Sequence, residues 1–565
     1  MAPRLRTPYH ARPMPILVRN IRLNLDEPED ALWPAVAKRL RVPVSALRTR
    51  AIVRRSLDAR RPDDLHFSYQ IEIDLDENPA AQLARLRRLG RSDVAWLTPR
   101  EEEVPVCGTA DLRHRPIVIG FGPGGMFAAL RLARFGYRPI VLERGREVRR
   151  RHRDVMQRFY RERDFDSASN LLFGEGGAGT YSDGKLYTRV NDPLCRVVLE
   201  MLYQHGADPD ILVDARPHVG SDRLPTVCTN LRRGIEALGG EVRFECHVDD
   251  LKVEDGRVIA LHVTGAGASS LSSAADGWMS VGPVILAVGH SARDTIRMLH
   301  ARGARIDAKP FQIGIRIEHP QAMVDRWQYG AAAGHHRLGA AEYHMVAKGA
   351  AGQLGDLFSF CMCPGGIILP TNESHGLIAT NGASRSQRSS GFANSGLVIT
   401  LDAGAIGGGG EAPALEAMAY IERWERLAFE TTGRSYRVPA QRATDFLAGV
   451  ASDGAIDTSY PLGGQWADIA SIMPEPVIAA LKRALPMLDA KYPGFAGPDA
   501  LIVAPETRAS APVRITRDSE SRQAVGVADL YPVGEGAGYA GGIVSAAVDG
   551  IKSADAIIRH YTEPR

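Results

Sequence analysis

The chain of 565 residues is too long for a single hydrophobic core and indicates two to four domains. Its 44% apolar and 24% charged residues are typical of a globular protein, and a formal charge of +3 gives no reason by itself to expect a nucleic-acid partner. Six cysteines over this length exclude a secreted disulfide framework, and no apolar run reaches the roughly 18 residues of a membrane-spanning helix.

The start of the chain carries no sign of secretion. Residues 1–13 are basic and rich in proline, without the apolar centre of a secretory signal. Met14 opens a strand-like segment and is an alternative start of the chain. Together with the cysteine content, these features predict a cytoplasmic protein.

Residues 14–98 predict an N-terminal α+β module. Alternating apolar residues predict strands, and helical periodicity predicts helices, in the order 16–25 (strand), 29–41 (helix), 50–57 (strand), 65–75 (strand), 79–89 (helix) and 93–97 (strand). The order β-α-β-β-α-β is that of a ferredoxin-like module. Pro34 argues against the first helix, because proline removes a backbone donor.

A basic run lies inside this module. Between Lys38 and Arg61 there are nine lysines and arginines and a single acid, Asp58. One interpretation is a patch for RNA or another polyanion. The other is a solvated face or a surface that docks on the rest of the chain. We favour the second, because no aromatic-glycine RNA-binding signature accompanies the arginines, so a nucleic-acid partner is disfavoured.

The most informative segment follows a linker over residues 99–113. A buried strand at 117–119 runs into Gly120-x-Gly122-x-x-Gly125, a helix is predicted to about Phe135, and a second strand over 139–142 ends at Glu143. Strand, glycines, helix, strand and acid in this order within about 30 residues form the βαβ fingerprint of a dinucleotide-binding site.

Each part of this fingerprint has a physical role. Gly120 makes the tight turn, Gly122 lets the backbone approach a pyrophosphate, and Gly125 lets the helix pack closely on the strand. The helix N-terminus presents free N–H groups and a partial positive charge to the phosphates. Glu143 is expected to accept hydrogen bonds from the adenosine ribose hydroxyls.

Nicotinamide and flavin enzymes share this fingerprint, so the choice depends on later motifs. Residues 284–289 (VILAVG) resemble the strand that closes the FAD site in glutathione-reductase-like flavoproteins. Residues 529–551 resemble the last motif of that group, in which a strand is followed by a helix that opens with Gly-Gly under the flavin. Glu535 stands where that group usually has aspartate.

Further segments resemble the bacterial uncharacterised FAD-dependent dehydrogenases, a family of the glutathione-reductase-like superfamily. They are residues 54–60 (RRSLDAR), 173–185 (FGEGGAGTYSDGK), 314–320 (GIRIEHP), 360–366 (FCMCPGG), 441–446 (QRATDF) and 506–515 (ETRASAPVRI). The resemblance covers almost the whole chain. It implies a fold and FAD, and it leaves the substrate open.

The resemblance implies an α/β fold with a glutathione-reductase-type, Rossmann-like FAD-binding domain formed by residues 114–305 and 500–562. An α+β substrate domain, residues 306–499, is inserted between the last two FAD motifs. FAD is expected to bind non-covalently. The residues expected to bind it are Gly120, Gly122, Pro123, Gly124, Gly125, Glu143, Arg144, Gly176, Gly177, Ser182, Lys185, Val248, Ala287, Gly289, Gly534, Glu535, Gly541, Gly542 and Ile543.

Two candidates for catalysis lie in the inserted segment. His319 has an ordinary pKa that suits a proton donor, although satisfying a local hydrogen bond is the commoner role of such a residue. Cys363 belongs to a Cys361-x-Cys363 pair that permits a redox role. A disulfide across one residue would be strained, so two buried thiols, or one thiol lining the flavin, are favoured.

Two cations are further candidates. Arg508 lies where the chain returns to the last FAD strand, so we expect it and residues 360–366 to line the reaction site; pairing with Glu506 or Asp518 is the alternative. Lys185 either neutralises flavin or substrate charge or is a surface lysine after a turn. No metal site is expected, because no second cysteine pair or histidine cluster completes four ligands.

These features predict an FAD-dependent oxidoreductase that acts on a small molecule, with an anionic substrate as one alternative. No second strand–GxGxxG–helix unit is visible, so either the substrate reduces the flavin or NAD(P)H binds transiently. An RNA-binding or RNA-modifying flavoprotein and an NAD-dependent Rossmann dehydrogenase without flavin are the competing hypotheses. The substrate and the oligomeric state are left open.

Overall fold

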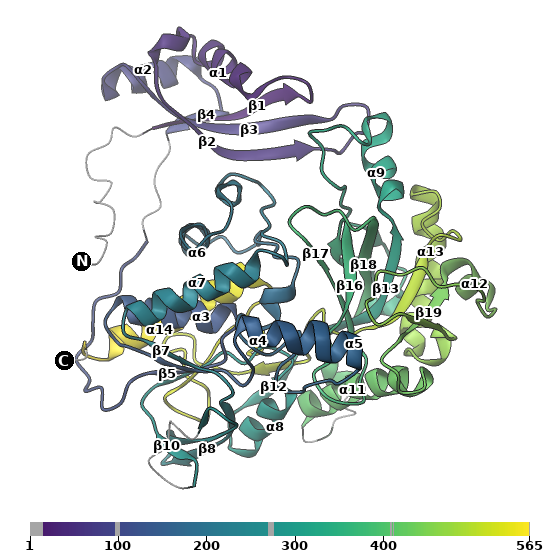
Figure 1. Ribbon diagram of the computed structural model, residues 1–565. Helices are drawn as coiled ribbons and strands as arrows, with labels where there is room; N and C mark the ends of the chain where they lie inside the picture. The colour runs from purple at the N-terminus through teal and green to yellow at the C-terminus, as the bar shows by residue number, and fades with distance from the viewer. Residues whose placement is uncertain (1–14, 97–101, 269–275, 407–409, 411, 564–565) are drawn as a thin grey trace. The chain divides into compact units, whose positions relative to one another are not determined.

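The computed structural model describes residues 15–96, 102–268, 276–406, 410 and 412–563 (Figure 1). Residues 1–14 and 97–101, which hold the alternative start and parts of the predicted module and linker, lie outside these ranges. Contacts divide the chain into two compact units. Unit 1 is Met1–Glu103, Asp208–Pro217 and Arg326–Leu338, and unit 2 is the rest.

Unit 1 is built on a four-stranded antiparallel sheet of order β2-β3-β1-β4. Its elements are β1 (Ile16–Asn24), α1 (Leu32–Leu40), β2 (Leu47–Asp58), β3 (His66–Leu75), α2 (Pro79–Leu89) and β4 (Val94–Trp96). Alternate residues of β3, including Ile71 and Ile73, share a core with Leu32 and Val36 of α1. Pro34 fits the first turn of α1, where the missing backbone donor is not needed.

Two later segments of the chain belong to unit 1, and an arginine bonds to each of them or from it. Arg55 exchanges backbone hydrogen bonds with Val213 and Ala215, and its guanidinium pairs with Asp214 at 2.8 Å. Arg337 donates to the Leu25 carbonyl at 2.9 Å and also to the Glu27 carbonyl. The unit is therefore closed by residues that are far away in sequence.

The basic run of unit 1 is largely compensated by acids. Five of its arginines form ion pairs with carboxylates: Arg39 with Asp93, Arg48 with Asp76, Arg55 with Asp210 and Asp214, Arg60 with Asp58, and Arg61 with Asp63. Most of these acids lie outside the run, so the sequence around the arginines did not reveal them. This pairing weakens the local positive field.

Unit 2 contains a five-stranded parallel sheet of order β23-β11-β5-β6-β7. The strands are β5 (Ile117–Ile119), β6 (Ile140–Leu142), β7 (Glu241–Arg243), β11 (Val284–Leu286) and β23 (Leu530–Pro532). Helices α3 (Pro123–Arg134), α7 (Leu224–Ala237) and α14 (Ile543–His560) cover one face (Figure 1). The antiparallel strands β8 (His247–Glu254), β9 (Arg257–Thr264) and β10 (Trp278–Ser280) cover the other, where Ile117 and Val284 share a core with Leu251 and Leu261.

A second, seven-stranded sheet of unit 2 has the order β14-β15-β18-β13-β21-β19-β20. Its strands are β13 (Phe311–Pro320), β14 (Val346–Ala347), β15 (Leu357–Cys363), β18 (Phe392–Leu401), β19 (Val438–Arg442), β20 (Gly464–Trp466) and β21 (Leu501–Glu506). The buried strand β13 pairs antiparallel with both β18 and β21.

The other elements connect these sheets and cover them. They are α4 (Val148–Arg153), α5 (Tyr160–Glu162), α6 (Leu194–Gln204), α8 (Arg293–Ala301), β12 (Ile306–Ala308), α9 (Gln321–Tyr329), β16 (Gly366–Pro370), β17 (Thr380–Ser384), α10 (Ala403–Ile406), α11 (Pro413–Thr431), α12 (Ala443–Ala448), α13 (Glu475–Lys491) and β22 (Val513–Ile515). Strands β16 and β17 form an antiparallel pair, as do β12 and β22.

Helices α3 and α14 touch through their backbones. A Cβ atom on Gly550 of α14 would lie 2.1 Å from the carbonyl oxygen of Gly124 in α3. Both residues are buried, so no space exists into which a side chain could turn. The distance between the two helices is therefore fixed by glycine.

We expect Gly550→Ala to lower the free energy of unfolding by about 2 kcal/mol, because an added methyl group must push two helix backbones apart. Urea unfolding of the full chain measures the change. Gly404→Ala is the matched control: Gly404 is an exposed helical glycine whose nearest new contact would be a side-chain oxygen at 3.3 Å, so its stability should stay level or rise. Equal stability of both variants would contradict the backbone contact.

Candidate functional site

The three glycines of the βαβ fingerprint are not equivalent in the structure. Gly120 has a φ of +93°, and a Cβ atom there would lie 2.5 Å from the Ala287 carbonyl oxygen. A Cβ atom on Gly125 would lie 2.0 Å from the Gly120 carbonyl oxygen, whereas one on Gly122 would meet only the Gly177 Cα at 3.9 Å. The protein's own packing requires the first and third glycines, while the space before Gly122 is open to a ligand.

Two helix N-termini lie at the same end of the parallel sheet as these glycines. Helix α3 follows β5 and helix α14 follows β23, and no side chain caps the first turn of either helix. Around them, Cβ atoms on Gly289 and Gly541 would meet nothing within 4 Å. Uncapped N–H groups beside open backbone are donors suited to an anionic ligand such as a dinucleotide phosphate.

Glu143, directly after β6, is a structural centre of this end of the sheet. Its buried carboxylate accepts hydrogen bonds from the backbone N–H groups of Phe121 (2.8 Å), Gly145 (2.9 Å) and Gly174 (2.8 Å). It thereby joins the glycine turn to the loop over residues 173–185. The neighbouring Arg144 pairs with Asp294 at 2.9 Å.

The 173–185 loop lies against the glycine turn, and a buried arginine holds it there. A Cβ atom on Gly177 would lie 2.9 Å from the Cα of Gly122. Arg151 is fully buried and donates to the carbonyl groups of Asn170 (2.7 Å), Glu175 (2.8 Å) and Gly177 (2.8 Å). The arginine-rich sequence of residues 146–153 predicts a solvated helix face, and this is wrong for Arg151, which is buried.

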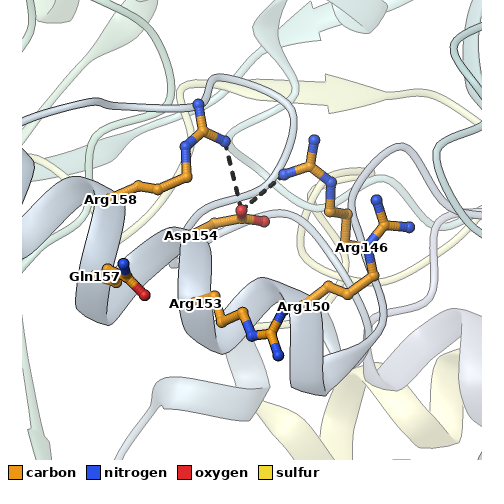
Figure 2. Close-up of a pocket in the computed structure, with 6 residues that line it drawn as sticks. All are labelled: Arg146, Arg150, Arg153, Asp154, Gln157 and Arg158. Atoms are coloured by element: carbon orange, nitrogen blue, oxygen red, sulfur yellow. Dashed lines mark hydrogen bonds and ion pairs between the residues drawn. The ribbon is translucent and has the colours of Figure 1, made fainter.

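Other arginines of this segment do face solvent. Arg146, Arg150, Arg153 and Arg158 line a surface pocket together with Asp154 and Gln157 (Figure 2). Asp154 pairs with Arg146 at 2.7 Å and with Arg158 at 3.5 Å, and Glu245 pairs with Arg146 and Arg150. The carboxylates satisfy much of the positive charge, so the pocket is not an open anion site.

Arg151→Met should lower the free energy of unfolding by about 3 kcal/mol or more, because three buried carbonyl groups lose their donor. The change should also lower the FAD content, since the 173–185 loop loses its anchor. Thermal unfolding and flavin absorbance measure the two effects. Arg149→Met, at an exposed position of the same helix, is the control and should change neither. A stable, fully loaded Arg151→Met protein would show that the loop does not need this anchor.

Lys185, at the end of this loop, is not a surface lysine. Its side chain is 15% exposed, and its ammonium group lies 3.0 Å from Asp183 and 3.9 Å from the sulfur of Cys363. It also donates to the Met362 carbonyl. Burial acts to lower the pKa of Lys185, but the two cysteines of β15 and Asp183 outweigh it and raise the pKa. Ser182, earlier in the loop, donates its hydroxyl to the Gly179 carbonyl.

The cysteine pair lies between two cations. Cys363 is buried and Cys361 is partly exposed, and the Cys363 thiol lies 3.3 Å from the Cys361 carbonyl oxygen. Arg316 of β13 donates to the same carbonyl at 2.8 Å and lies 4.0 Å from the Cys363 sulfur. A hydrogen bond from Cys363, followed by the charges of Lys185 and Arg316, lowers the pKa of Cys361 to about 5 against the opposing effect of burial.

Glu535 follows β23 and has an unusual environment. Burial raises the pKa of its carboxyl group to about 7; the nearby charge of Lys309 opposes this shift, and the Cys361 sulfur adds to it. The Oε1 atom of Glu535 lies 3.7 Å from Nδ1 of His290. Burial lowers the pKa of the His290 ring to about 3. Burial therefore moves the charge change of Glu535 towards neutral pH.

In protein freed of flavin, stability should fall as pH rises from about 5 to 8, and part of this fall should come from Glu535. A carboxyl whose folded pKa is raised stabilises the fold below its unfolded pKa, and this contribution is lost as pH passes the folded value. Glu535→Gln should flatten the dependence of Tm on pH in this range. Glu520→Gln, at an exposed position, should not. If the curves of Tm against pH run parallel for the wild type and Glu535→Gln, the raised pKa of Glu535 is contradicted.

Two buried arginines, Arg293 and Arg508, form a network with two buried glutamates next to His290. Arg508 pairs with Glu373 at 2.9 Å and with Glu425 at 3.3 Å, and Arg293 pairs with the same acids at 3.0 and 2.8 Å. Glu506 pairs instead with Arg316 at 2.6 Å. The local acids that the sequence suggested for Arg508 were therefore the wrong partners, although its backbone N–H does donate to Glu506.

His319 and Val248 are both core residues. His319 is fully buried on β13, where its Nε2 atom is bonded to the Phe495 carbonyl at 2.8 Å. Burial lowers the pKa of His319 to about 4, which favours the neutral ring. Val248 packs in the core between the parallel sheet and strands β8–β10. Neither environment provides the open access that a ligand-binding side chain needs.

The described residues offer neither a metal-ion site nor a membrane-spanning helix. Within those residues, no group of three or more His, Cys, Asp or Glu side chains is placed to hold a metal ion. None of the helices found in the same ranges is long and apolar enough to cross a membrane.

Comparison with known proteins gives the family. Residues 310–509 match the family described as FAD-dependent protein, C-terminal domain-like, and residues 15–74 match a domain of unknown function. A protein of Clostridium beijerinckii described as uncharacterized is 38% identical over 554 residues, which are 98% of this chain and 100% of that protein. The chain belongs to the family of this protein.

Solved structures match at much lower similarity. A geranylgeranyl bacteriochlorophyll reductase-like protein of Thermoplasma acidophilum is 13% identical, with a TM-score of 0.32, over 78% of this chain and 77% of that one. An iminodiacetate oxidase of Chelativorans is 13% identical, with a TM-score of 0.34, over 80% and 97% of the two chains. Similarity at this level carries no argument about the reaction.

The matched family is FAD-dependent, and the open glycine turn with its uncapped helix fits a dinucleotide. The chain is an FAD-dependent oxidoreductase with a mixed α/β fold, and FAD is its cofactor. The hypothesis of an NAD-dependent dehydrogenase without flavin is wrong for this reason. Neither the family match nor the site supports NAD(P)H as a second cofactor.

Proposed function

We propose that this oxidoreductase acts on a small molecule where the FAD-binding sheet meets the seven-stranded sheet. The observation that carries the proposal is the pair of uncapped helix N-termini, those of α3 and α14, at one end of the parallel sheet. Their free N–H groups and partial positive charges favour a ligand with two phosphates and an electron-accepting ring.

We assign the pyrophosphate to the start of α3, with Gly120, Gly122, Pro123, Gly124 and Gly125. Glu143 is the candidate for the adenosine ribose, and the open backbone at Gly289 and Gly541 is the candidate for the ring side. FAD supplies two-electron chemistry when bound. The N–H groups at the start of α14 stabilise negative charge placed before them.

We also propose the domain scheme that the resemblance implies. A glutathione-reductase-type FAD-binding domain, residues 114–305 and 500–562, would carry residues 306–499 as an inserted substrate domain. The parallel order β23-β11-β5-β6-β7 with a crossing layer of three antiparallel strands supports the first part. The all-antiparallel order β2-β3-β1-β4 supports a ferredoxin-like module over residues 14–98.

The candidate catalytic residues divide into two groups. Lys185 and Cys363 are close to each other and lie where the 173–185 loop meets β15. We place Arg508 behind them as a positioning residue, because both ends of its guanidinium are held by glutamates. We propose a structural role for His319, because its ring is buried and bonded to a backbone carbonyl.

The small-molecule proposal is preferred over an RNA-binding flavoprotein. The arginines of β2 and its neighbours are paired with carboxylates, which reduces the attraction for a phosphate backbone. Lys185, Arg316 and Lys309 gather on the flavin side instead, and they suit an anionic small molecule or an anionic ring.

A pair of glycine variants tests the FAD site. Gly122→Ala should keep the stability of the wild-type protein freed of flavin, because its methyl group meets only Gly177 at 3.9 Å, but should weaken FAD binding at least about tenfold. Gly125→Ala should lose both stability and FAD, since its methyl group would lie 2.0 Å from the Gly120 carbonyl oxygen. Flavin titration and thermal unfolding measure the two properties.

Normal FAD affinity in Gly122→Ala would overturn the assignment of the pyrophosphate to this turn. A protein that carries no FAD band near ~450 nm after purification, and takes up none, would overturn the site as a whole.

A further inference from the structure

We propose that Cys361 and Cys363 form a redox-active dithiol that exchanges an electron pair with FAD. The inference rests on the proposed position of FAD at the carboxyl end of the parallel sheet. It extends the proposed function by naming the groups of the protein that give electrons to the cofactor or take them from it.

The backbone around the pair departs from a regular strand. Cys361 has a φ of +43°, a left-handed conformation that residues other than glycine rarely adopt. The pairing of β15 with β18 shifts register between Phe360 and Cys363, which marks a bulge. In a regular strand these two side chains would point to the same face, and the bulge bends the strand between them. Strained residues and bulges of this kind cluster at functional sites.

The electrostatic surroundings favour a thiolate on the more accessible sulfur. Cys361 is partly exposed, and the Cys363 thiol donates to the Cys361 carbonyl oxygen at 3.3 Å. Lys185 and Arg316 place positive charge beside the pair. Interaction with Cys361 and burial raise the pKa of Cys363, which favours a thiolate on Cys361 beside a thiol on Cys363. A thiolate next to a thiol is the arrangement of a reactive dithiol.

The position of the pair connects it to the FAD site. Lys185 comes from the loop whose Gly177 packs on Gly122 of the glycine turn. On the other side, the Cys361 sulfur affects the charge of Glu535, which begins the segment leading to the N-terminus of α14. The pair therefore lies between two segments that we assign to FAD.

The chemical step balances without another reactant. The Cys361 thiolate and the Cys363 thiol form one S–S bond and lose two electrons and one proton. Oxidised FAD accepts the two electrons and the proton, and the reverse step reduces the disulfide. Charged and titratable groups facing the pair from all sides are Lys185, Asp183, Arg316, Glu506, Glu535 and Tyr343.

Alkylation of the native, FAD-loaded chain by iodoacetamide tests the thiolate. At pH 7 and without oxygen, we expect Cys361 to be labelled at least about tenfold faster than Cys195, as measured by peptide mass spectrometry. Cys195 is a matched control, because it is also partly exposed and burial raises its pKa. Lys185→Met should move the Cys361 labelling profile to higher pH and leave that of Cys195 unchanged.

Electron counting tests the dithiol. After oxidation by diamide, the wild-type chain and Cys195→Ser should each take up two more electrons per FAD in an anaerobic dithionite titration than Cys361→Ser. The peptide that contains both cysteines should lose two hydrogens on oxidation. Labelling of the wild-type chain needs no variant, so the proposal can be tested even if Cys361→Ser does not fold.

The proposal is overturned if Cys361 is labelled no faster than Cys195, or if the wild type takes up no more electrons than Cys361→Ser. Either result with a normal flavin spectrum would leave the FAD site standing and remove only the dithiol. If the purified chain binds no flavin but Cys361 is still labelled rapidly and the disulfide still forms, the proposed FAD site is overturned, and with it the electron exchange.

Discussion

Backbone contact at the start of α3 is the constraint on which the carboxyl end of the parallel sheet depends. Within one helical turn, Gly125 packs on the carbonyl of Gly120, Gly124 touches Gly550 of α14, and Gly122 lies against Gly177 of the 173–185 loop. The sheet, a second helix and the loop therefore meet at three adjacent glycines. A side chain at Gly125 or Gly550 would separate these elements, whereas one at Gly122 would meet only the Gly177 Cα at 3.9 Å.

Buried charges then fix how the later segments meet this core. Arg151 anchors the 173–185 loop through three carbonyl groups, and Arg316 joins β13 to β21 through Glu506. Arg293 of α8 and Arg508 share Glu373 and Glu425, and Glu425 lies on α11. Such pairs add little net stability, because their attraction roughly offsets the loss of hydration. Breaking one pair leaves a charge without a partner, so alternative packings are strongly disfavoured.

The cations near Cys361 and Glu535 have a shared effect on these two groups. Lys185 and Arg316 lower the pKa of Cys361, while Lys309 partly opposes the burial that raises the pKa of Glu535. A thiol whose pKa is below its ordinary value and a carboxyl group whose pKa is above it therefore lie near one another. This inversion of the ordinary order is typical of sites that move protons and electrons.

The sequence by itself determined the local elements and the cofactor class. The βαβ unit could be predicted because periodicity, turn glycines and the acid after the second strand are all local signals, and the six elements of unit 1 are present for the same reason. It did not reveal that Arg151 is buried among exposed arginines, that Arg508 pairs with Glu373 and Glu425, or that Lys185 meets Cys363. Those facts depend on contacts between residues far apart in the chain, and the tertiary structure decided them because burial and charge partners are set only when distant segments pack together.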